Sequence, residues 1–225
     1  MMRLMEIVLH NVKPKYMSES EVSGSDIYMK PQVVFEAVKK YMVCARSGHG
    51  KTSLLNFIYG VSSLFDGEIE LRLDKETVLL SGGRPIGERK LQLLRKNQLS
   101  YLFQELCLFP ELTAIENVEL KNGLTGHKSG SEMESMLDSL LPAGKKSQPV
   151  GTLSLGQRQR VAAVRALCQP FGFLMLDEPF SHIDRQNSEL LAEMVMKEVE
   201  GNGAGLIVTA LDAIDLFDFD QVLYL

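Results

Sequence analysis

The sequence predicts an α/β fold with a largely parallel sheet, and three observations support that expectation. Short apolar runs alternate with helix-like stretches along most of the chain, as in strand–helix–strand units. Residues 41–44 run directly into a glycine-bearing loop, which is followed by a helix-like stretch at 53–58. Residues 173–176 form an apolar run that ends on an acidic pair at 177–178. Buried strands with polar loops at their carboxyl ends account for all three observations.

The N-terminal part of the chain combines strand-like and loop-like segments. Residues 3–11 predict a strand, whereas residues 13–32 are mostly polar and serine-rich, which predicts a loop outside the core. Residues 33–38 and 41–44 are short β-favouring runs, and residues 53–58 have helical character. Strand, loop and helix therefore follow one another in the order that a phosphate-binding loop requires.

The middle of the chain changes from strands to helices. A turn at 66–67 precedes the strand-like residues 68–71, a loop at 82–85 follows, and residues 89–95 have the pattern of a surface helix. Between residues 106 and 150, helix-like stretches are interrupted by glycine and proline. We interpret residues 106–150 as a helical lobe inserted into the α/β core.

The C-terminal part returns to the alternating pattern. Residues 184–200 predict a helix, residues 206–209 a strand, and residues 221–225 a last strand. The sequence contains no internal repeat and no heptad run. We therefore expect residues 1–225 to form one domain that contains the inserted lobe.

Composition narrows the classes of function. The 225 residues are 45% hydrophobic and carry a formal net charge of -5, with acidic and basic residues scattered along the chain. Such a chain lacks the clustered basic residues of a nucleic-acid or membrane-surface protein, and we expect no nucleic-acid partner. No apolar run approaches the roughly 20 residues that span a bilayer, which indicates a cytoplasmic protein. The cysteines Cys44, Cys107 and Cys168 are odd in number and widely spaced, which predicts buried, reduced thiols.

Residues 45–52 read Ala-Arg-Ser-Gly-His-Gly-Lys-Thr, a relaxed form of the loop that binds nucleotide phosphates. In such a loop backbone N–H groups surround the phosphates, Lys51 supplies a full positive charge, and Thr52 offers a hydroxyl to Mg²⁺. Gly48 and Gly50 stand where the backbone must come closest to phosphate. Ala45 replaces the first glycine of the strict pattern, at little steric cost if its φ is negative.

The acidic pair Asp177 and Glu178 ends the apolar run at 173–176. A carboxylate at the end of a buried strand is placed to hold Mg²⁺ through water, and the neighbouring Glu178 is placed to polarise an attacking water. The alternative is an acidic turn before Pro179. Because the phosphate loop is in the same chain, nucleotide hydrolysis is the favoured interpretation.

Further segments, in matching order, resemble motifs of the ATP-binding cassette family, the nucleotide-binding subunits of ABC transporters. Residues 101–105 (Tyr-Leu-Phe-Gln-Glu) resemble its glutamine loop, residues 153–160 (Leu-Ser-Leu-Gly-Gln-Arg-Gln-Arg) its signature motif, and residues 181–184 (Ser-His-Ile-Asp) its D-loop. The resemblance covers nearly the whole chain. It implies an α/β fold: a P-loop NTPase core with a largely parallel sheet, an inserted helical lobe and antiparallel N-terminal strands.

The resemblance also implies catalytic and metal-binding roles. Glu178, Gln104 and Lys51 are the expected catalytic residues, and Thr52, Gln104 and Asp177 are the expected Mg²⁺ ligands. Gln104 would sense the nucleotide at the hinge to the helical lobe. The expected cofactors are therefore ATP and Mg²⁺.

A head-to-tail dimer with ATP at its interface is also implied, because Ser154 and Gly156 of one subunit would close over the γ-phosphate that another holds. Tyr16 corresponds to the aromatic residue that stacks on adenine, the alternative being a plain surface tyrosine. The expected ATP contacts are Tyr16, Ser47, Gly48, His49, Gly50, Lys51, Thr52, Ser53, Ser154, Gly156 and Gln157.

Two positions depart from the family pattern. Leu155 replaces a signature glycine and either crowds the dimer interface or turns back into the helical lobe. Ala210 stands where the family has a switch histidine that binds the γ-phosphate, and a methyl group cannot donate that hydrogen bond. Loss of one such donor typically slows a reaction roughly 10²- to 10³-fold, which predicts slow turnover. His49 and His182 are the candidates to replace it, the alternative being that both are surface histidines.

These features predict an ATP-hydrolysing subunit that powers a membrane transporter and lies at the inner face of the membrane through separate transmembrane subunits. Residues 112–120 most resemble lipoprotein-releasing and macrolide-exporter type subunits, which indicates export. The dimer is either a homodimer or, as Leu155 and Ala210 favour, a heterodimer with another cassette. The alternative function is a nucleotide-gated regulatory or interaction protein that binds ATP and dimerises with little or no hydrolysis. A DNA-repair or chromosome-type cassette is disfavoured because residues 106–150 are too short and too broken by glycine and proline for a long coiled coil.

Overall fold

A computed structural model describes residues 5–74, 76–83 and 88–225. Its strands are β1 (Met5–Pro14), β2 (Val33–Phe35), β3 (Lys40–Cys44), β4 (Phe65–Leu73), β5 (Glu76–Ser81), β6 (Leu99–Leu102), β7 (Phe173–Asp177), β8 (Gly205–Ala210) and β9 (Gln221–Tyr224). Its helices are α1 (Glu19–Val22), α2 (Lys51–Tyr59), α3 (Glu88–Asn97), α4 (Ala114–Asn122), α5 (Gly130–Leu140), η1 (Lys145–Ser147), η2 (Val150–Thr152), α6 (Leu155–Leu167) and α7 (Arg185–Asn202).

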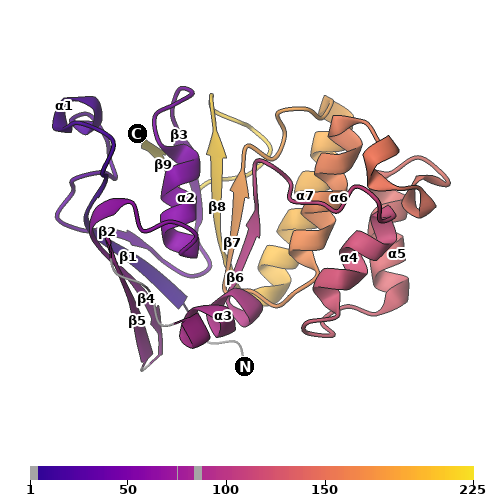
Figure 1. The fold of residues 1–225 in the computed structure, drawn as a ribbon. Helices are drawn as coiled ribbons and strands as arrows, with labels where there is room; N and C mark the ends of the chain where they lie inside the picture. Colours follow the sequence, from indigo (N-terminus) through magenta and orange to yellow (C-terminus); the bar gives the residue numbers. More distant parts are fainter. Residues whose placement is uncertain (1–4, 75, 84–87) are drawn as a thin grey trace.

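The central sheet has the strand order β6-β7-β8-β3-β9, and every neighbouring pair in it is parallel. The strands β7 and β8 are buried along their whole length, as expected where helices cover both faces of a parallel sheet. Their carboxyl ends point to the top of Figure 1, where the loops that follow β3, β7 and β8 come together. The prediction of a largely parallel sheet is confirmed.

The second sheet is antiparallel, in the order β2-β1-β4-β5, which confirms the expected antiparallel N-terminal strands. The turn predicted at 66–67 is wrong, because both residues lie inside β4 at a bulge where the register against β1 shifts between His10 and Lys13. Gly67 has φ +91°, and a Cβ there would lie 2.4 Å from the His10 carbonyl oxygen. The glycine therefore marks a bulge and not a chain reversal.

Strand β5 and strand β6 lie in segments for which the sequence analysis predicted no strand. The predicted helix at 89–95 is present as α3, with Leu91 and Leu94 buried on one face. The loop predicted at 82–85 is seen as a turn at residues 82–83, and its residues 84–85 lie outside the described part of the chain.

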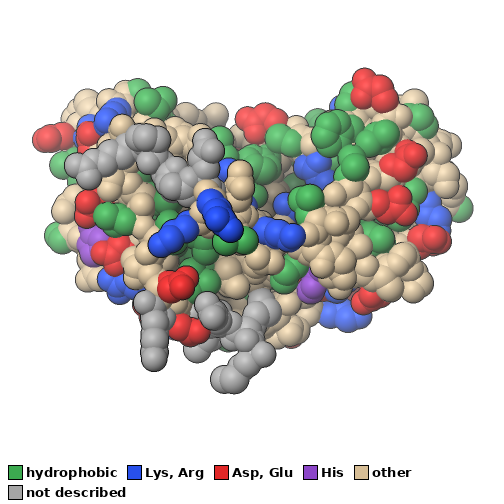
Figure 2. Space-filling model, turned by 60° about the horizontal axis from the view of Figure 1, so that its bottom comes forward, with side chains coloured by type: hydrophobic (Ala, Val, Ile, Leu, Met, Phe, Trp, Pro, Cys, Tyr) green, Lys and Arg blue, Asp and Glu red, His purple; other side chains and the backbone are tan. Residues whose placement is uncertain are grey.

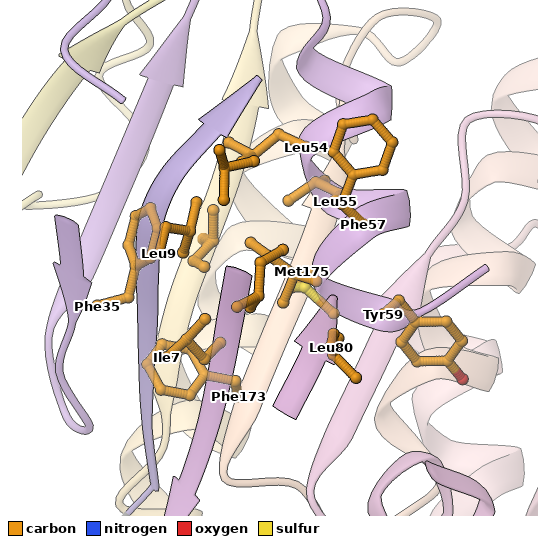
Figure 3. Packing of buried hydrophobic residues seen from close by; sticks show 14 of the residues in the cluster. Ile7, Leu9, Phe35, Leu54, Leu55, Phe57, Tyr59, Leu80, Phe173 and Met175 are labelled. Atoms are coloured by element: carbon orange, nitrogen blue, oxygen red, sulfur yellow. The ribbon is translucent and has the colours of Figure 1, made fainter. Parts of the chain in front are cut away.

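A first hydrophobic core fills the space between the two sheets and encloses α2. Figure 3 shows Leu54 and Leu55 of α2 in one cluster with Leu9 of the antiparallel sheet and Met175 of the parallel sheet. Helix α2 follows β3 after residues 45–50. Because the core holds both elements, it also fixes the loop that joins them.

The prediction that residues 13–32 form a loop outside the core is wrong. Ile27 and Tyr28 are buried, with 0% and 1% of their surface exposed. The Ser25 hydroxyl accepts hydrogen bonds from the N–H groups of both residues, and the Asp26 N–H donates to the Tyr224 carbonyl at 2.7 Å. The segment can be buried although it is polar, because its backbone groups form hydrogen bonds with distant strands. The composition of the segment does not report those bonds.

A second hydrophobic core lies on the other face of the parallel sheet, where α4, α5, α6 and α7 gather. Figure 1 shows α6 and α7 next to the sheet and α4 and α5 farther out. The helices α4 and α5 fall within residues 106–150 and pack on α6. The division of the chain into a core and an inserted lobe with these bounds stays a prediction.

Local capping explains where these helices begin. Thr113, Ser129 and Ser154 each form a capping box with the residue three positions later, at the starts of α4, α5 and α6. The Asp184 carboxylate accepts from the Asn187 N–H at the start of α7. The predicted helix at 184–200 is thereby confirmed.

Figure 2 views the molecule from below, at the amino ends of the parallel strands. Lys and Arg side chains gather near the centre of this face, with acidic side chains around them. Cys44 and Cys168 are buried as predicted, but Cys107 is exposed, so the expectation of three buried thiols is wrong for Cys107. None of the helices in the described ranges is both long and apolar enough to span a membrane.

Candidate active site

The phosphate loop joins the end of β3 to the start of α2. Gly48 and Gly50 have φ values of +81° and +89°, which favour glycine, and Gly50 forms the N-terminal cap of α2. Ala45 does not have a positive φ, so the methyl group at the first loop position is tolerated there. The loop lies at the N-terminus of α2, where N–H groups and the helix dipole favour a bound anion.

Tyr28 forms a hydrogen bond with this loop, a contact that the sequence analysis missed. Its hydroxyl donates a hydrogen bond to the Gly50 carbonyl oxygen at 2.7 Å. A Cβ at Gly50 would lie 2.9 Å from the same hydroxyl oxygen, so Gly50 is required both by its φ and by the space available. Burial raises the pKa of the Tyr28 hydroxyl, which keeps it a hydrogen-bond donor.

The Lys51 ammonium group lies between the loop and the acidic pair. Its Nζ donates to the Ala45 carbonyl at 2.6 Å and to the Arg46 carbonyl at 3.2 Å, and lies 3.3 Å from Glu178 Oε1. The side chain is only 5% exposed. Lys51 and Glu178 therefore face each other across a largely buried contact.

The residues expected to bind Mg²⁺ offer oxygen atoms close together. The Thr52 hydroxyl donates to Gln104 Oε1 at 3.0 Å. Burial raises the pKa of the nearby Asp177 carboxyl, and interaction with Thr52 partly offsets that shift. A hydroxyl, an amide oxygen and a carboxylate fit Mg²⁺, which prefers oxygen ligands. Within the described ranges no group of three or more His, Cys, Asp and Glu side chains forms a metal site, so phosphate oxygens would have to complete the coordination.

Asp177 is 2% exposed at the end of β7. The Thr209 hydroxyl donates to its Oδ1 at 2.6 Å, and the Tyr101 hydroxyl donates to its Oδ2 at 3.4 Å. Burial raises the pKa of the Asp177 carboxyl, and the hydrogen bond from Thr209 opposes that shift. The sequence analysis missed this contact of Thr209, because only the tertiary structure pairs β8 with β7 and places Thr209 opposite Asp177.

A cavity of about 270 Å³ opens between the phosphate loop and these side chains. The lining residues are Tyr16, Ser47, Gly48, Gly50, Lys51, Thr52, Ser53, Gln104 and Glu178. The Tyr16 hydroxyl is hydrogen-bonded to the Ser53 hydroxyl, and the residue is 59% exposed. His49 is exposed, with its Nδ1 3.1 Å from the Ser47 carbonyl oxygen. Nine of the predicted nucleotide-site residues thus share one cavity.

The predicted signature residues lie elsewhere, at the start of α6. The Ser154 hydroxyl accepts from the Gln157 N–H, and Gln157 Oε1 accepts from the Ser154 N–H. A Cβ at Gly156 would lie 2.3 Å from the His182 carbonyl oxygen, so this turn packs tightly on the loop after β7. Leu155 is 41% exposed and lines a different cavity of about 290 Å³, together with Gln104 and others. Ser154, Gly156 and Gln157 do not line the cavity at the phosphate loop.

Ala210 ends β8, and its carbonyl oxygen accepts from the Ala45 N–H at 3.2 Å. Beside it and Glu178 is a cavity of about 180 Å³. His182 is exposed, and of the residues described, neither His49 nor His182 is among those lining this cavity or the one at the phosphate loop.

A protein-family model described as "ABC transporter" matches residues 31–181, a stretch that includes the phosphate loop, the glutamine loop, the signature segment and the acidic pair. The chain belongs to the ABC transporter family. It is an ATPase of the ABC type with a mixed α/β cassette fold.

Several curated proteins are similar to this cassette over most of its length. The lipoprotein-releasing system ATP-binding protein LolD of Syntrophotalea carbinolica is 29% identical over 92% of this chain and 91% of its own. LolD of Aquifex aeolicus is 33% identical over 74% of this chain and 73% of its own. An uncharacterised ABC transporter ATP-binding protein, YclH of Bacillus subtilis, is 30% identical over 80% and 75%.

Solved cassette structures have the same fold. The ATP-binding cassette MJ0796, solved as a dimer in a post-hydrolysis state bound to ADP and Pi, matches with a TM-score of 0.77 and 25% identity, over 97% of this chain and 94% of its own. A second dimeric structure of MJ0796 matches with a TM-score of 0.76 and 26% identity over the same shares.

Proposed function

We propose that this cassette hydrolyses Mg·ATP to power a membrane transporter, with the cavity at the phosphate loop as its nucleotide site. The observation that carries this proposal is the position of Lys51, whose ammonium group lies at the loop and 3.3 Å from Glu178 Oε1. A positive charge for the phosphates and a carboxylate for the attacking water are thereby adjacent.

Each residue at the cavity has a proposed role. The loop N–H groups and Lys51 bind the phosphates, Thr52 and Gln104 hold Mg²⁺ together with Asp177, and Glu178 acts as general base. Bound Mg²⁺ would bridge phosphate oxygens and neutralise the charge that develops on them. Support comes from the oxygen atoms of Thr52 and Gln104, which lie 3.0 Å apart.

Tyr16 is proposed to stack on the adenine, since its ring is exposed at the rim of the cavity. Its hydroxyl bond to Ser53 holds the ring next to the first turn of α2. The His49 N–H donates to the Arg46 carbonyl oxygen at 3.3 Å in this structure, and it is proposed to bind phosphate when nucleotide is present.

The second half of the site is proposed to come from another cassette. Ser154, Gly156 and Gln157 do not line the cavity of their own chain, as expected if they act on a nucleotide held by a partner. The MJ0796 relatives were solved as dimers. The partner cassette is proposed to be a second copy of this chain if both nucleotide sites of the dimer work with Leu155 and Ala210. It is proposed to be a different cassette if these two residues impair hydrolysis.

The transporter is proposed to be an exporter whose membrane-spanning subunits are separate chains. This cassette is proposed to lie at the inner face of the membrane through contact with them. Relatives named as lipoprotein-releasing system subunits support this direction. Residues 106–150 are proposed to be the inserted helical lobe whose surface binds those membrane-spanning subunits.

A second candidate function is a nucleotide-gated regulatory protein that binds ATP and dimerises but hydrolyses little. One observation favours it. Ala210, at the end of β8, supplies only a buried methyl group beside Glu178.

Steady-state Mg·ATP hydrolysis by the wild type and by Glu178→Gln separates the two candidates, together with ATP-dependent dimerisation on a sizing column. Turnover that falls at least about 100-fold in Glu178→Gln supports an enzyme with Glu178 as its base. The regulatory function is supported if the wild-type protein binds ATP and dimerises but does not hydrolyse ATP, either alone or after mixing with membrane extract.

A further inference from the structure

Glu178 has an unusual backbone conformation. Its φ is +49°, in the left-handed region that non-glycine residues rarely adopt. Such a conformation persists only where surrounding contacts hold it. The contacts that do so determine where the Glu178 carboxylate points.

Three side chains hold the peptide groups of Glu178, one at its N–H and two at its carbonyl oxygen. On one side, the Glu178 N–H donates to the carbonyl oxygen and to the hydroxyl oxygen of Thr209, each at 3.2 Å. On the other side, Gln159 Nε2 donates to the Glu178 carbonyl oxygen at 2.8 Å. The Ser181 hydroxyl donates to the same carbonyl at 3.1 Å.

Gln159 is well placed to fix this geometry. It is 3% exposed in the second turn of α6, and its Oε1 accepts from the His182 N–H at 3.3 Å. One end of the amide therefore binds the chain at Glu178 and the other end binds it at His182. These partners also decide the orientation of the amide, because only nitrogen can donate to a carbonyl and only oxygen can accept from an N–H.

We propose that Gln159 is a positioning residue for the reaction, which holds the Glu178 backbone in its left-handed conformation and so keeps the Glu178 carboxylate at the phosphate loop. The inference rests on the proposed role of Glu178 as general base. Gln159 does not touch the cavity itself, so its effect must pass through Glu178.

The mechanism predicts an effect on rate more than on nucleotide binding. Without the Gln159 contact, the Glu178 carbonyl oxygen keeps only the longer hydrogen bonds from the Ser181 hydroxyl and N–H, at 3.1 and 3.4 Å. The left-handed conformation is then held less firmly, and the carboxylate is displaced from Lys51. A displacement of about 1 Å at a reacting group costs up to roughly 100-fold in rate. The phosphate loop is untouched, so ATP affinity is expected to change little.

The test compares Gln159→Met with Gln169→Met. Gln169 is a matched control because it is also buried, at 0% exposure, and its Nε2 also donates to two backbone carbonyls, those of Arg95 and Leu99. We expect Gln159→Met to lower kcat about 10- to 100-fold with the ATP Kd changed less than about threefold. Gln169→Met is expected to keep kcat within about twofold of the wild type, whatever its thermal stability.

A readout that does not depend on activity accompanies the kinetics. Hydrogen–deuterium exchange of the nucleotide-free protein is expected to become faster in residues 178–182 in Gln159→Met and to stay at the wild-type rate there in Gln169→Met. If Gln159→Met does not fold, Gln159→Asn replaces it, because an amide one methylene shorter cannot reach both Glu178 and His182.

A double variant separates this inference from the proposed function. If Gln159 acts through Glu178, adding Gln159→Met to Glu178→Gln lowers turnover no further. Wild-type kcat in Gln159→Met, an equal loss in Gln169→Met, or additive losses in the double variant would overturn the inference. Full turnover in Glu178→Gln would instead overturn the role of Glu178 itself.

Discussion

Thr209 connects the two acidic residues of the site, and replacing it tests the electrostatics of the buried strand ends. Its side chain is 0% exposed, and its hydroxyl donates to Asp177 Oδ1 at 2.6 Å. Thr209→Val preserves the shape but removes that donor. Asp177 then keeps the Tyr101 hydroxyl at 3.4 Å, a much longer hydrogen bond.

The expected cost follows from the charge on the acceptor. A hydrogen bond to a buried ionised group contributes about 1.5 to 3 kcal/mol. For a chain of this length that corresponds to a fall in Tm of about 3 to 12 °C. Because valine fills the same volume, little of the loss comes from a cavity.

The loss should depend on pH. Burial raises the pKa of Asp177, so the folded protein binds this proton more tightly than the unfolded chain, and Asp177 lowers stability as pH rises through its folded-state pKa. Thr209 opposes that shift by stabilising the carboxylate. The deficit of Thr209→Val should therefore be larger near about pH 7.5 than near about pH 4, because a carboxyl group whose pKa is raised takes up its proton as the pH falls.

The assay is urea unfolding at both pH values in EDTA and without nucleotide, so that only the protein's own groups contribute. Thr209→Ser is the control, since it keeps the hydroxyl and loses one methyl group, about 1 kcal/mol at either pH. A Thr209→Val deficit below about 0.5 kcal/mol, or one that is equal at both pH values, would refute the reasoning.

Three further changes have expected outcomes. Ala210→His restores a donor next to the site and should raise kcat at least about 10-fold in a steady-state ATPase assay, where an unchanged kcat would show that the donor is dispensable. Gly50→Ala adds a methyl group 2.9 Å from the Tyr28 hydroxyl oxygen at φ +89°. It should cost about 1 to 2 kcal/mol of stability and weaken ATP binding, measured by thermal unfolding and ligand titration. Glu198→Gln leaves the Lys128 ammonium group, now 2.8 Å from a carboxylate oxygen, without its ionic partner. That loss should be about 1 to 3 kcal/mol in urea unfolding.

Matched controls accompany the last two variants. Gly24 has open space around it and no positive φ, so Gly24→Ala should leave stability and ATP binding unchanged within error. Glu189 pairs with Arg185 at an exposed site where both side chains are more than half exposed, so Glu189→Gln should cost about 0.5 kcal/mol or less. A Gly50→Ala variant as stable as Gly24→Ala, or equal losses in Glu198→Gln and Glu189→Gln, would contradict the corresponding prediction.

The fold class, the phosphate loop and the acidic pair could be predicted because their signals are local. Alternating apolar runs specify a parallel sheet, and the spacing of Gly48, Gly50 and Lys51 specifies a loop at a helix start. The Asp-Gly pair at 66–67 is a local pattern that is compatible with two structures. A glycine with positive φ serves a chain reversal and a bulge equally well, and only pairing with β1 decides between them.

The amino-acid sequence by itself determined the family, the order of the motifs and the residue types at the nucleotide site. Tertiary structure alone decided which distant side chains hold the site residues in place. Tyr28 donates a hydrogen bond to the Gly50 carbonyl, Thr209 to the Asp177 carboxylate, and Gln159 to the Glu178 carbonyl. Their sequence separations of 22, 32 and 19 residues exceed any helical or strand period, so no pattern along the chain reports these contacts. Only the packing of the sheets and of α6 brings the partners within hydrogen-bonding distance.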